Sequence, residues 1–114
     1  MDSKITKYRK IIKHIFDDYM ALLNRKSQAD IDTFAIIDDK NDHYLIQVLG
    51  WDEIRKVWET SVYVRIFNNK FWIEVDWTEM GIGNDLVAAG VPKEDIVLAF
   101  HHPSTRQFTD FAIA

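Results

Sequence analysis

Apolar residues recur every three or four positions in the first part of the chain, between Ser3 and Leu23. They are Ile5, Tyr8, Ile12, Ile15, Phe16, Tyr19, Leu22 and Leu23. This spacing places them on one face of an α-helix, for which Ser3 is a suitable N-cap. At 1.5 Å per residue the helix is about 30 Å long, enough to cross a four-stranded sheet. The polar residues 24–30 end the pattern.

The middle of the chain changes to short runs of β-forming residues. Residues 31–37 and 43–51 flank residues 38–42, a cluster of Asp, Asn and Lys that is typical of a turn. Residues 58–67 and 70–77 flank a second turn signal. We therefore expect two β-hairpins.

The turn of the second hairpin is Asn68-Asn69, and asparagine tolerates the positive φ of a two-residue type I′ turn. A two-residue loop fixes the register. It predicts a core face from the pairs Val62 with Val75, Val64 with Ile73, and Ile66 with Phe71. The opposite face then carries Tyr63, Arg65, Phe67, Lys70, Trp72, Glu74 and Asp76.

The last third of the chain predicts a short helix, a strand and a packed tail. The helix covers residues 78–89, begins with a threonine that can cap it, and ends at Gly90, with Pro92 preventing its continuation. Residues 96–100 are an apolar run of strand length, which we expect to be buried on both faces. The tail, residues 108–114, is apolar enough to pack as a last strand or against a neighbouring subunit.

Together these elements predict a single α+β domain over residues 1–114. The long N-terminal helix packs on an antiparallel sheet of about four to six strands, and a short helix lies in the C-terminal half.

Charge is unevenly distributed along the chain. Residues 1–26 carry seven Lys or Arg against three Asp, whereas residues 27–114 carry seven against fifteen acidic residues. An acidic body repels a phosphate backbone, so we expect no tight autonomous binding to DNA. The basic helix positions are Lys4, Lys7, Arg9, Lys10 and Lys13. Two interpretations of them stay open: a solvated face balanced by the acidic body, or a DNA contact inside a larger complex.

The chain has no cysteine, which excludes disulfides and thiolate metal sites and fits a reducing cytosol. Its first residues are charged, and no apolar run approaches the ~20 residues that cross a membrane. We therefore expect a soluble cytoplasmic protein with no membrane association.

Catalytic residue types are present, but they lack the spacing of a known motif. Glu74, Asp76 and Glu79 could hold Mg²⁺ as in a nuclease, yet Arg65, the nearest cation by register, is more simply a salt-bridge partner of Glu74. The histidines His14, His43, His101 and His102 have no zinc spacing, and no strand-to-helix elbow surrounds Ser104 in a triad with His101 and Asp110. We expect no catalytic residues, no metal and no cofactor.

The most specific functional signal is a surface for a partner. Tyr63, Phe67 and Trp72 on the non-core face would leave an apolar patch, which is typical of an interaction surface. The alternative is a second layer of the same chain, such as the C-terminal helix or the tail, over that face. With Glu74, Asp76 and Glu79 these are the candidate partner-binding residues. The same face, or the tail, predicts a homodimer or higher homo-oligomer.

Five segments follow one another in a fixed order: Asp42–Leu45, Gly50–Asp52, Trp72–Glu79, Gly81-Ile82 and Ala89–Pro103. In this order they resemble the XisI family, the fdxN element excision controlling factors found mainly in cyanobacteria. The family pattern commonly has Gln at the position of Glu74 and Gly at that of Ala99.

This resemblance implies a noncatalytic accessory or regulatory protein that acts with a XisH-like partner, while a separate site-specific recombinase excises the DNA element. We expect the partner to bind the acidic residues Glu74, Asp76 and Glu79 together with Trp72. The alternative from a different class is a metal-assisted nuclease or a DNA-binding component of the same system.

Overall fold

The long N-terminal helix is confirmed in the computed structural model, which describes residues 3–24 and 30–114. Helix α1 spans Lys4–Asn24. The Oγ of Ser3 accepts a hydrogen bond from the Thr6 amide at 3.1 Å, so Ser3 is the predicted N-cap. Residues 25–29 of the expected polar break lie outside the described residues.

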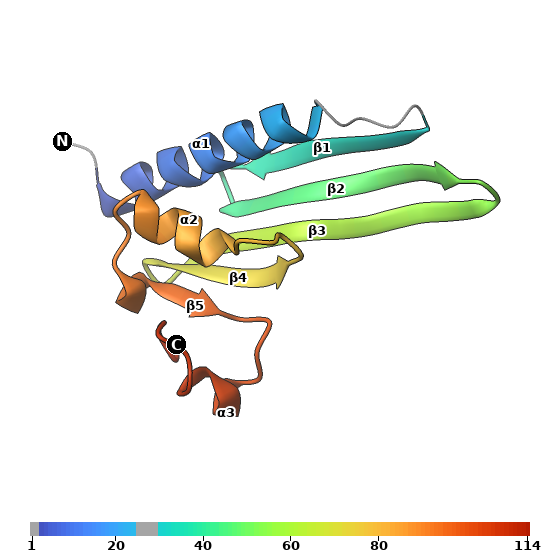
Figure 1. Ribbon diagram of the computed structural model, residues 1–114. Coiled ribbons are helices and arrows are strands. Elements are labelled where there is room, and N and C mark those ends of the chain that lie inside the picture. Colours follow the sequence, from blue (N-terminus) through green and yellow to red (C-terminus); the bar gives the residue numbers. More distant parts are fainter. Residues whose placement is uncertain (1–2, 25–29) are drawn as a thin grey trace.

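Five strands form one sheet in the order β1-β2-β3-β4-β5 (Figure 1). They are β1 Ile31–Asp38, β2 His43–Asp52, β3 Arg55–Phe67, β4 Lys70–Asp76 and β5 Ile96–Leu98. The first four strands are antiparallel neighbours, so both predicted hairpins are confirmed. The short helices are α2 Ile82–Ala88 and α3 Pro103–Arg106, with a 3-10 turn at Lys93–Asp95. The α+β fold class is confirmed.

Strand β5 departs from the expected antiparallel arrangement because it pairs with β4 in parallel. Helix α2 joins the two strands, and such a crossover returns the chain in its original direction. The strand is also shorter than the predicted residues 96–100, because the His101 amide bonds the Leu98 carbonyl and turns the chain. Ile96 and Val97 are fully buried, as expected.

The turn between β3 and β4 has the predicted form, since Asn68 and Asn69 have φ values of 52° and 64°. The predicted pairs Val64 with Ile73 and Ile66 with Phe71 are present. The predicted pair Val62 with Val75 is wrong, because a β-bulge between these pairs shifts the register.

Beyond the bulge Val62 faces Asp76, and Tyr63 faces Val75. A shift of one residue moves each later side chain to the other face of the sheet. The bulge therefore turns Asp76 toward the face that carries the helices and removes Val75 from the core.

The turn that joins β2 and β3 was not predicted. It contains Glu53 at a φ of 54°, and β3 starts at Arg55 and not at Trp58. The resulting hairpin extends past the ends of the other strands (Figure 1). In β2, a Cβ on Gly50 would lie 2.2 Å from the carbonyl oxygen of Asp30. Only glycine therefore allows the backbone before β1 to approach β2 this closely.

Helix α2 begins at Ile82 and not at the predicted Thr78. The reason is the carboxylate of Asp76, which accepts hydrogen bonds from the amide of Ile82 at 2.8 Å and from the amide of Thr78 at 3.0 Å. These bonds hold the intervening loop outside the helix. The end of α2 is as predicted: Gly90 has a φ of 99°, and the Val91 amide bonds the Leu86 carbonyl.

The C-terminal tail packs on its own chain. The amide of Ala112 donates to the carbonyl of Ile96 at 2.8 Å, and Ala112 forms a parallel bridge with Val97. Phe111 packs against the core beside Gly83, where a Cβ would lie 3.3 Å from the phenyl ring. The tail thus forms one more bridge along β5, although Phe108 and Ile113 are exposed.

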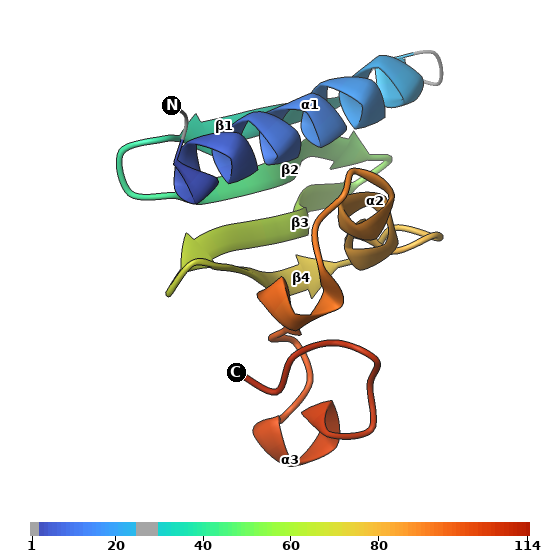
Figure 2. The same cartoon turned by 90° about the vertical axis from the view of Figure 1, so that its left-hand side faces the viewer.

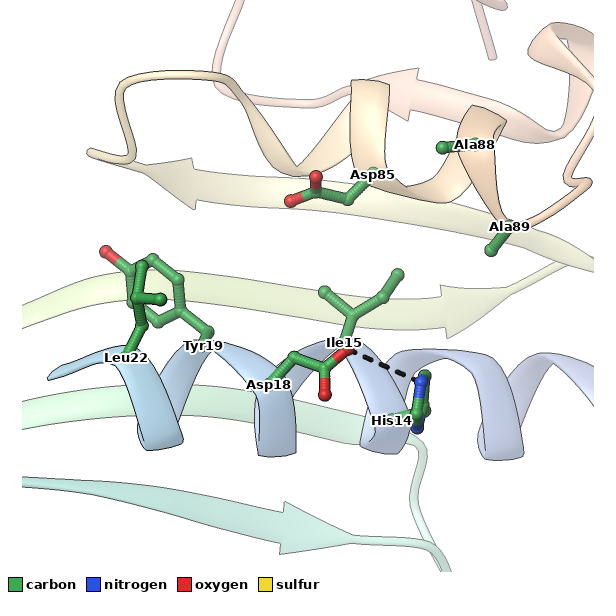
Figure 3. A pocket seen from close by; sticks show the side chains of 8 residues that line it. All are labelled: His14, Ile15, Asp18, Tyr19, Leu22, Asp85, Ala88 and Ala89. Atoms are coloured by element: carbon green, nitrogen blue, oxygen red, sulfur yellow. Dashed lines mark ion pairs between the residues drawn. The ribbon is translucent and has the colours of Figure 1, made fainter. Parts of the chain in front are cut away.

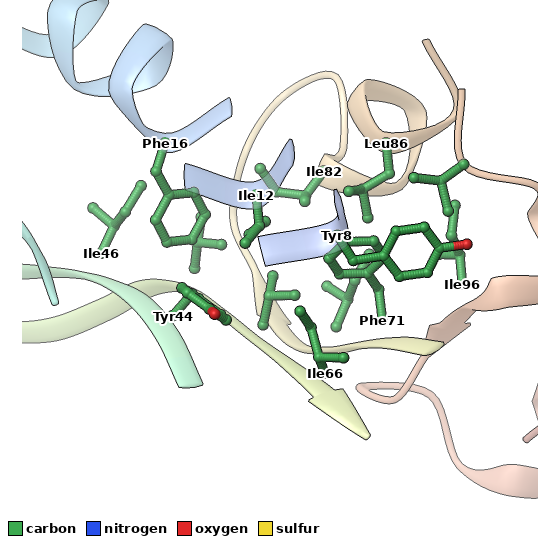
Figure 4. Packing of buried hydrophobic residues seen from close by; sticks show 14 residues of the cluster. Tyr8, Ile12, Phe16, Tyr44, Ile46, Ile66, Phe71, Ile82, Leu86 and Ile96 are labelled. Carbon is green, nitrogen blue, oxygen red and sulfur yellow. The ribbon is translucent and has the colours of Figure 1, made fainter. Parts of the chain in front are cut away.

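The hydrophobic core lies between the helices and one face of the sheet (Figure 4). Helix α1 lies over β1 and β2, and α2 lies over β4 (Figure 2). Helix α1 contributes Tyr8, Ile12 and Phe16, and α2 contributes Ile82 and Leu86. The strands contribute Tyr44, Ile46, Val62, Val64, Ile66, Phe71, Ile73 and Ile96. The opposite face, called the outer face below, carries no helix from α1 or α2.

A buried polar cluster fixes α1 to the C-terminal half. The hydroxyl of Tyr8 donates to the carboxylate of Asp95 at 2.5 Å, and Lys4 Nζ lies 2.7 Å from the same carboxylate. Burial would raise the pKa of Asp95, but the hydrogen bonds from Lys4 and Tyr8 outweigh it and lower that pKa overall. The cluster therefore holds Asp95 in its charged form.

Candidate interaction surfaces

Four of the six predicted partner-binding residues lie together on the outer face: Tyr63, Phe67, Trp72 and Glu74. Arg65 joins them, since its Nε donates to Glu74 at 3.0 Å. Its guanidinium also lies 4.9 Å from the ring centroid of Phe67 and 5.7 Å from that of Trp72. The predicted salt bridge between Arg65 and Glu74 is therefore present, and it sits between two aromatic rings.

Asp76 and Glu79 do not belong to this group. Asp76 lies on the helix side of the sheet, where its carboxylate also accepts a hydrogen bond of 2.5 Å from the Thr78 hydroxyl. Glu79 is exposed in the loop before α2. The expectation that Glu74 and Asp76 share one strand face is wrong, because the bulge separates them.

Glu74 and Asp76 thus have structural partners on opposite faces of the sheet, and Glu79 lies apart from both in the loop before α2. In the part of the chain that the structure describes, no three His, Asp or Glu side chains form a group that could hold a metal ion. The hydroxyl of Ser104, which the sequence analysis did not assign to a triad, lies 2.9 Å from Nδ1 of His102, the residue that caps α3.

The C-terminal segment covers part of the outer face. Arg106 lies over the Trp72 ring at 5.7 Å and donates to the carbonyl of His101 at 3.0 Å. The indole of Trp72 donates to the carbonyl of Phe67 at 2.9 Å. The C-terminal segment therefore covers Trp72 in part, while Phe67 stays 47% exposed.

The outer face continues over β1, β2 and the start of β3, which the sequence analysis missed. The registers place Ile36 opposite Leu45, Leu49 opposite Trp58, and Trp51 opposite Lys56 on this face. Trp58 is 74% exposed and Trp51 is 54% exposed. The two exposed tryptophans were the available signal, but without the turn at Glu53 they did not predict a shared face.

A second surface is a groove of about 420 Å³ between α1 and α2 (Figure 3). It is lined by His14, Ile15, Asp18, Tyr19, Leu22, Asp85, Ala88 and Ala89. Burial raises the pKa of Asp85, and the nearby charge of Asp76 adds to this effect. Burial likewise raises the pKa of Tyr19, together with the charges of Asp76 and Glu79. The groove suits an apolar side chain and disfavours an anion.

The basic positions of α1 are largely neutralised within the chain. Arg9 makes two hydrogen bonds to the carboxylate of Asp42, at 2.7 and 3.1 Å, and Lys13 bonds Asp39 at 2.7 Å. Lys4 pairs with Asp95, as described above. This agrees with the interpretation of a helix face balanced by the acidic body of the same domain.

In the described parts of the chain, no helix combines the length and apolar character that crossing a membrane demands.

Comparison with known proteins places the chain in a family. The family model described as XisI protein matches residues 1–113. The crystal structure of fdxN element excision controlling factor XisI from Anabaena variabilis ATCC 29413 is 42% identical, with a TM-score of 0.88 over 98% of this chain and 100% of that one.

A XisI-like protein from the same organism is 29% identical, with a TM-score of 0.89 over 96% of this chain and 99% of that one. The comparison with curated proteins gives no match. Because the family model spans nearly the whole chain, the chain belongs to the XisI family.

Proposed function

We propose that this protein is a noncatalytic regulatory factor that controls the excision of a DNA element by a separate site-specific recombinase. The observation that carries the proposal is the similarity over almost the full chain to a XisI protein described as an fdxN element excision controlling factor. Similarity over complete chains at 42% identity favours a shared role over a shared fold alone.

The proposed mode of action is contact with a XisH-like protein. Two features support it: an outer face with exposed aromatic side chains, and a net charge of −4. An acidic domain with an apolar patch is suited to a basic partner that handles nucleic acid, because opposite charges steer association. We assign the acidic contribution mainly to the exposed Glu79, because Glu74 is paired with Arg65 at 3.0 Å and Asp76 accepts hydrogen bonds at the start of α2.

Co-expression with a XisH-like protein tests this proposal. We expect a complex that co-purifies at low ionic strength and weakens at high ionic strength. Phe67→Glu should abolish co-purification, because it places a charge in the centre of the contact. Phe108→Glu is the matched control: Phe108 is 82% exposed in the tail, and its substitution should leave the complex intact.

Two results would contradict the proposal. The absence of any complex at low salt would remove the XisH-like partner. A complex that survives both Phe67→Glu and Glu79→Lys would remove this surface from the contact and direct the search to the groove between α1 and α2.

A further inference from the structure

Strand β3 has an open edge along its first half. Strand β4 pairs with β3 only from Val62 onward, and the last backbone bond on that side joins the Trp77 amide to the Ser61 carbonyl. Residues 55–60 therefore meet no strand on this side within the described part of the chain. Their side chains are mostly exposed, with Val57 and Thr60 half-buried. Unpaired backbone groups on such an edge are a template for another strand.

We propose that a second copy of this chain pairs with this edge, antiparallel, about a two-fold axis at Val57. In this register Arg55 lies opposite Glu59 of the second copy, Lys56 lies opposite Trp58, and Val57 lies opposite its own counterpart. Directly opposed residues of an antiparallel pair point to the same face. The edge is thus complementary to itself in charge, and the symmetry repeats each contact twice.

Existing contacts inside the chain leave these side chains available. Arg55 lies 3.7 Å from Asp52, a distance that makes only a weak ion pair, and the two side chains are 78% and 60% exposed. Lys56 lies 5.3 Å from the ring centroid of Trp51 on the outer face, next to the position that Trp58 of the second copy would take. A lysine between two indole rings is a favourable cation–π arrangement.

The same pairing covers exposed apolar residues at both ends of the edge. Ile54, at the tip of the β2–β3 hairpin, is 94% exposed, and in the proposed register it lies opposite Thr60 of the second copy. Trp77 lies close to Thr60 of the same copy. The Trp77 amide donates a hydrogen bond to the carbonyl of Ser61, the residue after Thr60, and Trp77 is 81% exposed. The tip of each copy would therefore reach the exposed indole of the other copy.

On strand β1, at the other end of the sheet, the two registers centred on the middle of the strand oppose like charges. Its edge residues include Asp30, Asp32 and Asp38. A symmetric antiparallel pairing centred on Phe34 opposes Asp30 to Asp38, and one centred on Ala35 opposes Asp32 to Asp38. Like charges directly opposite each other are destabilising. In these two central registers the β1 edge opposes like charges, whereas the β3 edge paired about Val57 opposes Arg55 to Glu59.

The oligomeric state of the isolated full chain tests the inference independently of any XisH-like partner. Light scattering coupled to size exclusion should give twice the 13.4 kDa of one chain. Glu59→Arg and Arg55→Glu should each weaken the dimer roughly tenfold or more, because each opposes like charges twice. The double variant Arg55→Glu/Glu59→Arg should restore the dimer. Such a restoration would show that the single variants lose the dimer through opposed charges and not through unfolding.

A cysteine test uses the absence of native cysteine. Val57→Cys places two thiols across the axis with Cα atoms about 4.5 to 5.5 Å apart, within the range of a disulfide. Mild oxidation should therefore give a covalent dimer, whereas the control Asp32→Cys on the β1 edge should dimerise without forming a disulfide between the two copies. A wild-type monomer at high micromolar concentration, equal cross-linking of both variants, or a dimer indifferent to the charge substitutions would each overturn the inference.

Discussion

At the residue scale, Asp76 shows how a carboxylate that resembles a site residue can be structural. Its two oxygens accept hydrogen bonds from the amides of Thr78 and Ile82 and from the Thr78 hydroxyl. These bonds satisfy donors that the first turn of α2 and its preceding loop would otherwise leave unpaired. The residue therefore fixes where α2 begins.

We expect Asp76→Ala to lower the free energy of unfolding by ~0.5 to 2 kcal/mol, because it removes the cap of α2. Chemical denaturation followed by circular dichroism measures the change. Glu79→Gln, in the exposed loop three residues later, is the control and should leave the midpoint unchanged. Equal effects of the two substitutions would mean that the cap contributes nothing.

Asp95 predicts a dependence of stability on pH. Because its pKa is lowered in the folded state, its contribution is fully present above the unfolded value of about 3.9 and is lost as the pH falls through the folded value. We expect Asp95→Asn to lower the melting temperature at neutral pH and to reduce the difference between neutral pH and pH 3. Parallel curves of melting temperature against pH for the wild type and Asp95→Asn would exclude the Asp95 cluster as the origin of the pH dependence.

At the element scale, α1 is held by a narrower stripe than its sequence pattern predicts. Tyr8, Ile12 and Phe16 are buried, whereas Ile15 lines the groove between α1 and α2, and Leu22 is 59% exposed. The buried positions are spaced four residues apart, so their side chains stack along one line of the helix. The neighbouring apolar positions Ile5, Ile11, Ile15, Tyr19 and Met20 are only partly buried where they pack against the core.

We expect Ile12→Ala to cost ~2 to 5 kcal/mol, because Ile12 is fully buried and its truncation leaves a cavity. The same substitution at Ile15 should cost less, since that side chain already borders an open groove. Urea denaturation gives the loss in free energy of unfolding for each variant, and both variants lose the same side-chain atoms. A larger effect at Ile15 would place the main contact of the helix on α2 and not on the sheet.

At the scale of the whole molecule, the basic helix and the acidic body neutralise each other. Lys4, Arg9 and Lys13 each pair with an aspartate from another element. Binding to a DNA duplex requires such cations to displace counterions from phosphates. Because these cations are paired with aspartates inside the domain, less positive charge is available to bind DNA.

We therefore expect the isolated protein to show no saturable binding to duplex DNA at micromolar concentration and physiological salt, measured by fluorescence anisotropy. Asp39→Asn/Asp42→Asn should increase nonspecific binding, because it releases Lys13 and Arg9 from their partners. Tight binding by the wild type that Lys7→Glu abolishes would assign a DNA contact to α1. Mg²⁺-dependent cleavage that Asp76→Asn abolishes would instead support the nuclease alternative.

The sequence alone determined the elements whose signals are local. The spacing of apolar residues fixed α1, Asn68-Asn69 fixed the β3–β4 turn, and Gly90 fixed the end of α2. Each depends on residues close together in the chain, whose backbone preferences act whatever the rest of the protein does. The order of the five segments that resemble XisI also predicted the family, which the match over residues 1–113 confirms.

Only the tertiary structure decided what depends on pairing between distant segments. The bulge opposite Tyr63 separated Asp76 from Glu74, the crossover through α2 made β5 parallel, and Arg106 came to lie over Trp72. A bulge changes the face of every later residue without an obvious mark in the sequence. The open edge of β3 likewise exists because β4 stops at Asp76, opposite Val62, and the complementary charges of that edge become visible only once the neighbouring strands are known.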